Sequence, residues 1–285
     1  MRNFRFLQPK GYDSLLRAKE EERETAFLLA GGTNLLSYIK MGKYKEGLLI
    51  DATRIDELKG IEETKDALRI GAGVTMAELL ENTLVGEKLP YFQETLFTFA
   101  NPLIRNKATL GGNLADASPI ADTAPILLAL DAQVVAASAK GTRVIELKDF
   151  FTGVNKTSLK PEELIESILV PLGRGTKAKM VKLGLRNGYS CSVSSAAVGM
   201  ELDGDTIKDL RIALGGVAPI PVRAGKCEKA LIGTKLEGKT VAGAAEKVNE
   251  DISPISDVRG SAEYRRGIAI SQVKQAIAEA AGMEV

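Results

Sequence analysis

The stretch Leu28–Leu35 reads LLAGGTNL: an apolar run, two adjacent glycines, and then residues that favour the start of a helix. The run Ala26–Ala30 predicts a short buried strand, and Thr33 is expected to cap a helix over Asn34–Lys40. Because glycine has no Cβ, the backbone N–H groups of such a turn can approach an anion closely. The turn suits the diphosphate of a dinucleotide, although a plain strand-to-helix turn with positive φ is the commoner explanation for one such segment alone.

A second segment of the same kind occupies Thr109–Asp122, which reads TLGGNLADASPIAD. It again joins two glycines to polar side chains, and Asn113 and Ser118 can bond phosphate or sugar oxygens. Asp122 can accept a hydrogen bond from a sugar hydroxyl, or it can cap the helix that follows. Each feature taken singly is mostly structural, but an extended dinucleotide needs contacts along its length. Two glycine segments therefore favour a dinucleotide site.

Other nucleotide motifs are incomplete. The segment Gly71–Met76 (GAGVTM) follows a strand, but Met76 stands where a Rossmann fingerprint requires its third glycine. We interpret this segment as a turn. No G-x-x-x-x-G-K-[ST] pattern occurs, which argues against a P-loop NTPase.

The composition excludes several kinds of chemistry. Among 285 residues, 38 are basic and 37 acidic, so the chain lacks the positive charge that nucleic-acid binding needs. The absence of histidine excludes Ser-His-Asp and Cys-His catalysis and imidazole metal sites. The two cysteines, Cys191 and Cys227, are too few for a four-cysteine iron–sulfur cluster, and we expect two unreactive core thiols rather than a disulfide. Any redox group must be a bound organic cofactor.

The longest apolar stretches, Ala124–Leu130 and Cys191–Met200, are much shorter than the roughly 20 residues that span a bilayer. Met1–Lys10 lacks the apolar core of a secretory signal. We expect a cytoplasmic protein that binds neither membranes nor nucleic acid.

Helical and strand patterns alternate along the first part of the chain. Thr75 and Glu78 are spaced as a capping box. The predicted helices are Tyr12–Glu24, Asn34–Lys40, Thr75–Glu81, Pro90–Ala100 and Asp122–Leu130. The predicted strands are Ala26–Ala30, Leu48–Ile50, Ala67–Ala72 and Leu164–Val170, with a hairpin of Gln133–Ala137 and Arg143–Glu146.

The composition changes over Pro161–Gly175, where prolines and glycines accumulate, and we place a domain boundary there. The strands predicted beyond it are Lys177–Leu185, Ser192–Leu202 and Thr206–Leu214, and the helices are Ala224–Ile232, Thr240–Glu250 and Ala262–Ala281. An antiparallel sheet with helices packed beside it makes an α+β domain.

Four long segments resemble the FAD-binding subunits of xanthine dehydrogenase, carbon monoxide dehydrogenase and related molybdenum hydroxylases. They are LLAGGTNLL at Leu28–Leu36, IRNKATLGGNLADASPIADTAPILLALDA at Ile104–Ala132, RIALGGVAPIPVRA at Arg211–Ala224, and SDVRGSAEYRR at Ser256–Arg266. The resemblance covers nearly the whole chain. It implies an α+β fold: a two-subdomain FAD-binding domain of the vanillyl-alcohol-oxidase (PCMH) type over 1–174, divided at about 1–58 and 59–174, and an α+β C-terminal domain over 175–285.

The resemblance also assigns contacts to FAD. The amides of Gly31–Thr33 and Gly111–Asn113 would face one crevice and bind the diphosphate, and Asp122 would bond the ribose or ribityl region. The full expected set is Leu28, Leu29, Ala30, Gly31, Gly32, Thr33, Asn34, Leu35, Phe99, Thr109, Leu110, Gly111, Gly112, Asn113, Ser118, Asp122, Ile165 and Lys182. Phe99 would be an aromatic contact, Ile165 an apolar one near the ring system, and Lys182 a basic group near the flavin. Judged without the resemblance, Phe99 and Ile165 are core residues and Lys182 is a surface charge.

This sequence departs from the family pattern at Asn34, where members commonly carry Asp. The amide keeps hydrogen-bonding capacity and loses a charge, so we expect FAD binding to survive with changed local electrostatics. Some relatives also carry a cluster-binding loop in this subunit, for which two cysteines are too few.

The resemblance implies a division of labour among subunits. Substrate would be hydroxylated at a molybdopterin centre on a large subunit. Electrons would pass through [2Fe–2S] clusters on a small subunit to FAD on this chain, and then to NAD or another acceptor. The assembly would be a dimer of heterotrimers, and this chain would need neither a catalytic residue nor a metal of its own.

Two alternatives stay open. A stand-alone FAD oxidoreductase of the same fold would need a proton donor near the flavin, and no residue is identified as one. A non-catalytic scaffolding protein would be expected to have lost the glycine segments, and both are intact.

Overall fold

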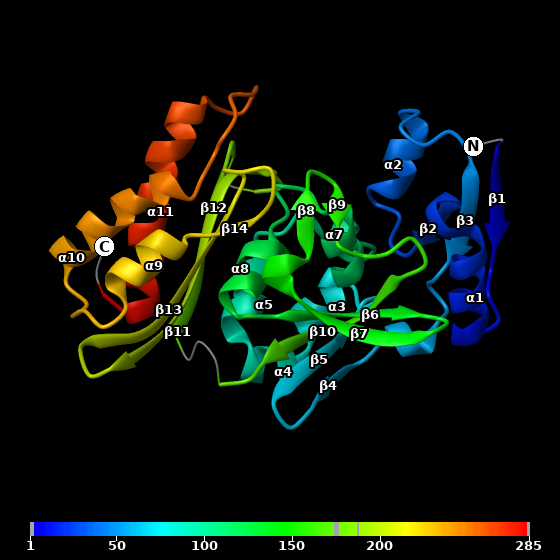
Figure 1. Ribbon diagram of the computed structural model, residues 1–285, viewed down its shortest axis with the longest axis horizontal. Coiled ribbons are helices and arrows are strands. Elements are labelled where there is room, and N and C mark those ends of the chain that lie inside the picture. Colours follow the sequence, from blue (N-terminus) through cyan, green and yellow to red (C-terminus); the bar gives the residue numbers. More distant parts are fainter. Residues whose placement is uncertain (1–2, 174–176, 187, 284–285) are drawn as a thin grey trace.

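The computed structural model of the 285-residue chain describes residues 3–173, 177–186 and 188–283. In this part of the chain, three sheets of three, five and four strands succeed one another, together with a two-stranded hairpin. Figure 1 shows the N-terminal sheet at one end of the molecule, the five-stranded sheet in the middle, and the C-terminal sheet with its helices at the other end.

The N-terminal sheet is parallel, in the order β1-β3-β2. Its elements are β1 (Phe4–Leu7), α1 (Tyr12–Glu22), β2 (Ala26–Leu29), α2 (Leu35–Lys40) and β3 (Gly47–Asp51), with short 3-10 helices at Arg23–Thr25 and Asp56–Leu58. Helix α1 connects β1 to β2 and buries Leu15 and Leu16 in a small apolar core. The predicted helix, both predicted strands and the short second helix are confirmed here, whereas β1 was not predicted.

The central sheet is antiparallel, in the order β4-β5-β10-β6-β7. Its strands are β4 (Ile61–Glu63), β5 (Ala67–Gly71), β6 (Gln133–Ser138), β7 (Gly141–Glu146) and β10 (Leu164–Pro171). The predicted hairpin is β6-β7. The hydroxyl of Tyr12 donates to a carboxylate oxygen of Glu166 at 2.7 Å, which ties α1 to this sheet.

Six helices lie between β5 and β6 in sequence. They are α3 (Met76–Glu81), α4 (Thr83–Lys88), α5 (Pro90–Phe97), α6 (Pro102–Arg105), α7 (Leu110–Asp116) and α8 (Thr123–Ala129). The predicted capping box is confirmed, because the side chains of Thr75 and Glu78 bond reciprocally to each other's backbone. A small hairpin of β8 (Phe151–Gly153) and β9 (Lys156–Thr157) precedes β10, after a 3-10 turn at Leu147–Asp149.

The C-terminal sheet is antiparallel, in the order β11-β12-β13-β14. Its strands are β11 (Lys177–Gly184), β12 (Ser192–Asp203), β13 (Thr206–Gly215) and β14 (Val222–Arg223), and its helices are α9 (Gly225–Leu231), α10 (Gly238–Ala245) and α11 (Ala262–Ala281), with a 3-10 turn at Glu246–Glu250. The three long strands and the helices agree with the sequence patterns.

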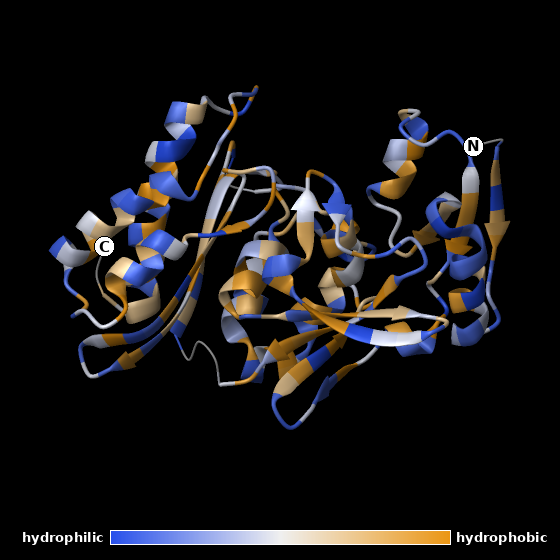
Figure 2. Cartoon of the chain, in the orientation of Figure 1, coloured by the Kyte–Doolittle hydropathy of each residue, from blue (hydrophilic) through white to orange (hydrophobic). Residues whose placement is uncertain are grey.

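Helix α8 lies against the C-terminal sheet although it precedes that sheet by some fifty residues. Residues of β12 alternate between two apolar cores: Ala197 joins the core that contains α8, whereas Ala196 and Val198 join the core of α9–α11. The approach is close, because a Cβ on Gly199 would stand 2.5 Å from the carbonyl oxygen of Ala129. Figure 2 shows α8 as mostly apolar, while α1 and the outer turns of α10 and α11 carry polar residues. Helix α8 is thus shared by the two halves of the chain.

Candidate functional site

The first glycine segment connects β2 to α2 through two glycines with different constraints. Gly32 has φ +67°, a left-handed conformation that glycine adopts without penalty. Gly31 lies against another segment, because a Cβ built on it would stand 1.8 Å from the carbonyl oxygen of Lys107. A side chain at Gly31 would require the backbone to move, and a side chain at Gly32 would place its residue in a strained left-handed conformation.

The amides of this segment are available to a ligand. Within the described residues, the backbone N–H groups of Gly31–Leu35 donate to no protein acceptor, and the first helical bond runs from the amide of Leu36 to the carbonyl of Gly32 at 3.1 Å. The residues are half-buried, apart from the exposed Asn34. A run of consecutive N–H groups without partners is a donor set that fits an anion such as a diphosphate. The expected cap at Thr33 is wrong: the N-cap of α2 is Asn34, and its side chain makes no capping bond.

The second glycine segment is not a loop. Thr109 is the N-cap of α7, and the two glycines form the first turn of that helix. The amide of Gly111 donates to Ala72 (2.9 Å), that of Gly112 to the Thr109 hydroxyl (3.1 Å), and that of Asn113 to the Thr109 carbonyl (2.9 Å). All three amides therefore already have protein acceptors, unlike the amides of Gly31–Leu35.

Close packing explains why residue 111 is a glycine. A Cβ there would stand 2.5 Å from the Cβ of Ala72. Among the side chains of the segment, Leu110 is buried. Asn113 is half-buried and accepts from the Thr123 hydroxyl at 2.5 Å, and Ser118 is half-buried in the turn before α8.

The structure brings the two glycine segments together. Besides the contact of Gly31 with Lys107, the side-chain amide of Asn34 donates to a carboxylate oxygen of Asp116, the last residue of α7, at 2.8 Å. Asp116 was not among the residues expected at the site, since a single acidic residue in a helix carries no signal by itself.

Asp122 and Lys182 meet in a buried ion pair. Nζ of Lys182 lies 2.6 Å from Oδ2 of Asp122, and each side chain is 9% exposed. Oδ1 of Asp122 accepts from the hydroxyl of Ser192, which is fully buried, at 2.6 Å, and Nζ of Lys182 also donates to the carbonyl of Thr98 at 3.0 Å. The interpretation of Lys182 as a surface charge is wrong. Asp122 precedes α8 as its N-cap residue, but its carboxylate bonds to β11 and β12 rather than to the helix.

Phe99 and Ile165 lie in the same large core. Phe99 is 7% exposed and Ile165 is 6% exposed. The carbonyl of Phe99 accepts from Arg105 at 2.7 Å, and Ile165 stands at an irregularity of the β10-β6 pairing. Their expected core position is confirmed. Leu28 and Leu29 of β2, together with Ala30, are only half-buried, which leaves apolar surface beside the available amides.

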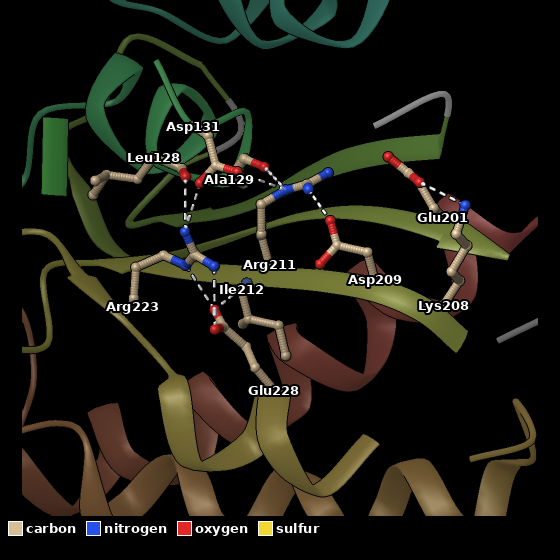
Figure 3. Close-up of polar contacts among 10 residues, drawn as sticks. All are labelled: Leu128, Ala129, Asp131, Glu201, Lys208, Asp209, Arg211, Ile212, Arg223 and Glu228. Carbon is tan, nitrogen blue, oxygen red and sulfur yellow. Dashed lines mark hydrogen bonds and ion pairs between the residues drawn. The ribbon is translucent and has the colours of Figure 1, made fainter. Parts of the chain in front are cut away.

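The opposite end of α8 is held by arginines of the C-terminal sheet (Figure 3). Arg211, buried on β13, donates through Nε to the carbonyl of Ala129 at 2.9 Å. Arg223 on β14 pairs with Asp131 at 3.0 Å and with Glu228 of α9 through two bonds of 2.7 and 3.1 Å. Cations near the last carbonyls of a helix stabilise it. Both ends of α8 are thus bonded to residues that follow position 176.

The two thiols differ in environment. Cys227 is buried in the C-terminal core, as expected, and burial raises the pKa of its thiol to about 12. Cys191 is exposed, so its expected core position is wrong, and both cysteines are free.

Thiol alkylation should separate them. With iodoacetamide at neutral pH, we expect one adduct on the native protein, at Cys191, and two after denaturation, because a buried thiol of high pKa supplies almost no thiolate. Intact-mass measurement would count the adducts. Two adducts on the native protein would contradict the buried position of Cys227.

No helix among the described residues is long and apolar enough to cross a membrane. The same part of the chain contains no group of three or more His, Cys, Asp or Glu side chains arranged to hold a metal ion.

Two family models match this chain. Residues 2–173 match the family model described as the FAD binding domain in molybdopterin dehydrogenase, and residues 179–280 match that of the CO dehydrogenase flavoprotein C-terminal domain. The glyceraldehyde dehydrogenase medium chain of Sulfolobus acidocaldarius is 33% identical over 94% of this chain and 98% of its own length. The carbon monoxide dehydrogenase medium chain of Hydrogenophaga pseudoflava is 32% identical over 96% of both chains.

Solved structures show the same architecture. A chain of carbon monoxide dehydrogenase from Hydrogenophaga pseudoflava superposes with a TM-score of 0.95 at 32% identity, covering 98% of both chains. A chain of quinoline 2-oxidoreductase from Pseudomonas putida 86 superposes with a TM-score of 0.91 at 27% identity, covering 98% of this chain and 97% of that one.

Proposed function

We propose the function of this chain from the family to which it belongs, the FAD-binding medium subunits of the carbon monoxide dehydrogenase and xanthine dehydrogenase type of molybdenum hydroxylases. As in that family, it is an FAD-binding component of an oxidoreductase. We propose that it is an electron-transfer subunit. It accepts electrons from [2Fe–2S] clusters of a small partner subunit and passes them through FAD to NAD or another acceptor. A large subunit carries the molybdopterin centre, and the complete cytoplasmic assembly is a dimer of heterotrimers.

One observation supports FAD binding at particular atoms of this chain. The backbone amides of Gly31–Leu35 have no protein acceptors. These N–H groups, next to the half-buried Leu28 and Leu29, are proposed to hold the diphosphate. When bound, FAD supplies one- and two-electron redox chemistry, and the protein supplies binding and orientation.

The other proposed contacts are made by side chains. Three residues are proposed to bond the cofactor through their side-chain polar atoms, in place of the amides that the helix already uses: Thr109 at the N-cap of α7, Asn113 within it, and Ser118 just after it. Asp122 and Lys182, fixed by their ion pair, are proposed to set the charge beside the flavin. Phe99 and Ile165 are proposed to contribute apolar contacts from the edge of the core. The proposed domain limits are 1–174, with subdomains at about 1–58 and 59–174, and 175–285.

Native affinity purification of the tagged chain tests the proposal. We expect recovery of a yellow complex that contains a large subunit and a cysteine-rich small subunit, with flavin and [2Fe–2S] absorbance together. Protein recovered alone that turns over a small substrate with NAD(P)H would instead identify a stand-alone FAD oxidoreductase. Protein that stays colourless after addition of FAD would refute both.

A further inference from the structure

Asp116 is one of the points at which the α2 segment contacts the rest of the FAD-binding domain. Its carboxylate accepts from the Asn34 amide at 2.8 Å. Tyr38, one turn further along α2, lies near the same carboxylate; burial and then the charge of Asp116 raise the pKa of that tyrosine to about 12. Two polar side chains, one at the N-cap of α2 and one within the helix, thus lie close to one carboxylate.

A second set of contacts surrounds the first. Asn155, in the turn between β8 and β9, donates through its side-chain amide to the carbonyl of Asp116 at 2.7 Å and accepts from Lys43 at 3.3 Å. Nζ of Lys43 lies 4.0 Å from the centre of the Tyr38 ring, within the range of a cation–π contact. The residues from Asn34 to Lys43 are therefore bonded to the end of α7 and to the β8-β9 turn. In Figure 1, α2 stands apart from the other helices of its subdomain.

These contacts fix the orientation of the available amides. The segment Gly31–Leu35 is held at its beginning by the packing of Gly31 on Lys107, and near its end by the bond from Asn34 to Asp116. The N–H groups without acceptors, those of Gly31–Leu35, are therefore close in sequence to Gly31 and Asn34, the two residues that are held in place. Rotation of the segment would require the second bond to break.

We propose that Asp116 is a positioning residue of the FAD site: through Asn34 it holds the amides of Gly31–Leu35 in the orientation that binds the diphosphate. The inference rests on the proposed function of this segment. It also explains why residue 34 is an amide in this chain. A carboxylate at 34 would face the carboxylate of Asp116 at hydrogen-bond distance, and two like charges there repel.

Reversing the pair tests the proposal in the full-length chain. N34D should weaken FAD binding on the order of tenfold, as expected for about 1.4 kcal/mol. The double variant N34D/D116N restores an amide–carboxylate bond with the direction reversed, and it should bind FAD within about twofold of the wild type. N3D, which adds the same charge at an exposed asparagine before β1, should leave the affinity unchanged. Fluorescence titration with FAD gives the three affinities, and urea unfolding without FAD reports whether each variant folds.

The reversed pair separates positioning from simple repulsion of the diphosphate. Both N34D and N34D/D116N carry a carboxylate at 34, so repulsion of the diphosphate by that group would weaken binding in both variants, and that result would overturn the proposal. Unchanged affinity in N34D would overturn it as well. If the wild type itself fails to bind FAD, the proposed function fails, and that outcome is distinct from either of these.

Discussion

Replacing Lys182 by methionine should lower the free energy of unfolding by about 3 kcal/mol. The substitution keeps most of the side-chain volume and leaves the carboxylate of Asp122 buried, with Ser192 as its remaining side-chain partner. An isolated buried charge loses its hydration without compensation, so most of the cost comes from the aspartate rather than from the lost lysine. Urea unfolding followed by circular dichroism measures the change.

Two variants make this prediction sharp. K182M/D122N removes both charges and should recover most of the loss, because no unpaired charge remains. K179M removes another lysine of β11, whose ion pairs with Glu94 and Glu279 are more exposed, and should cost less than about 1 kcal/mol. A K182M variant no less stable than K179M would show that the pair does not stabilise the fold.

Replacing Gly31 by alanine should weaken FAD binding about tenfold to a hundredfold. The new Cβ would stand 1.8 Å from the carbonyl oxygen of Lys107, a contact that only a backbone shift can relieve. Overpacking of this kind costs about 1–3 kcal/mol, and the available amides follow directly after the shifted residue. FAD titration measures the affinity of the variant, and urea unfolding of the same protein measures the change in its free energy of unfolding.

G243A is the matched control for this substitution. Gly243 lies inside α10 with no atom within 4 Å of a built Cβ, so alanine there should be neutral or slightly stabilising. If G31A binds FAD as tightly as the wild type does, then the Gly31–Leu35 segment either moves freely or does not hold the cofactor.

Local patterns predicted most of the elements. The capping box at Thr75 and Glu78, the β6-β7 hairpin and the long amphipathic α11 depend on residues close together in sequence, and all are present. The first glycine segment was identified for the same reason: a strand, two glycines and a helix start lie within eight residues.

The second glycine segment shows where local patterns fail. Two glycines disfavour a helix interior by about 1 kcal/mol each, so a loop was the natural expectation. The helix forms because distant backbone groups fix its start: the amide of Leu110 donates to Val74 and that of Gly111 to Ala72. Tertiary contacts of this kind leave no periodic signal.

The residues that hold the site together were the least predictable. Lys182 and Ser192 lie 60 and 70 positions after Asp122, and Asp116 lies 82 positions after Asn34. Nothing in the spacing relates these partners. The resemblance pointed to Asp122 and Lys182 individually, but only the fold shows that they contact each other.

The attachment of α8 at both ends affects how relatives could be recombined. A chimera joined at the boundary between the two halves would give α8 to one parent, and Lys182, Ser192, Arg211 and Arg223 to the other. The crossover that keeps this helix with its C-terminal partners lies before Asp122, inside what the chain order suggests is the first domain. If the C-terminal unit is exchanged together with α8, all of these contacts come from the same parent.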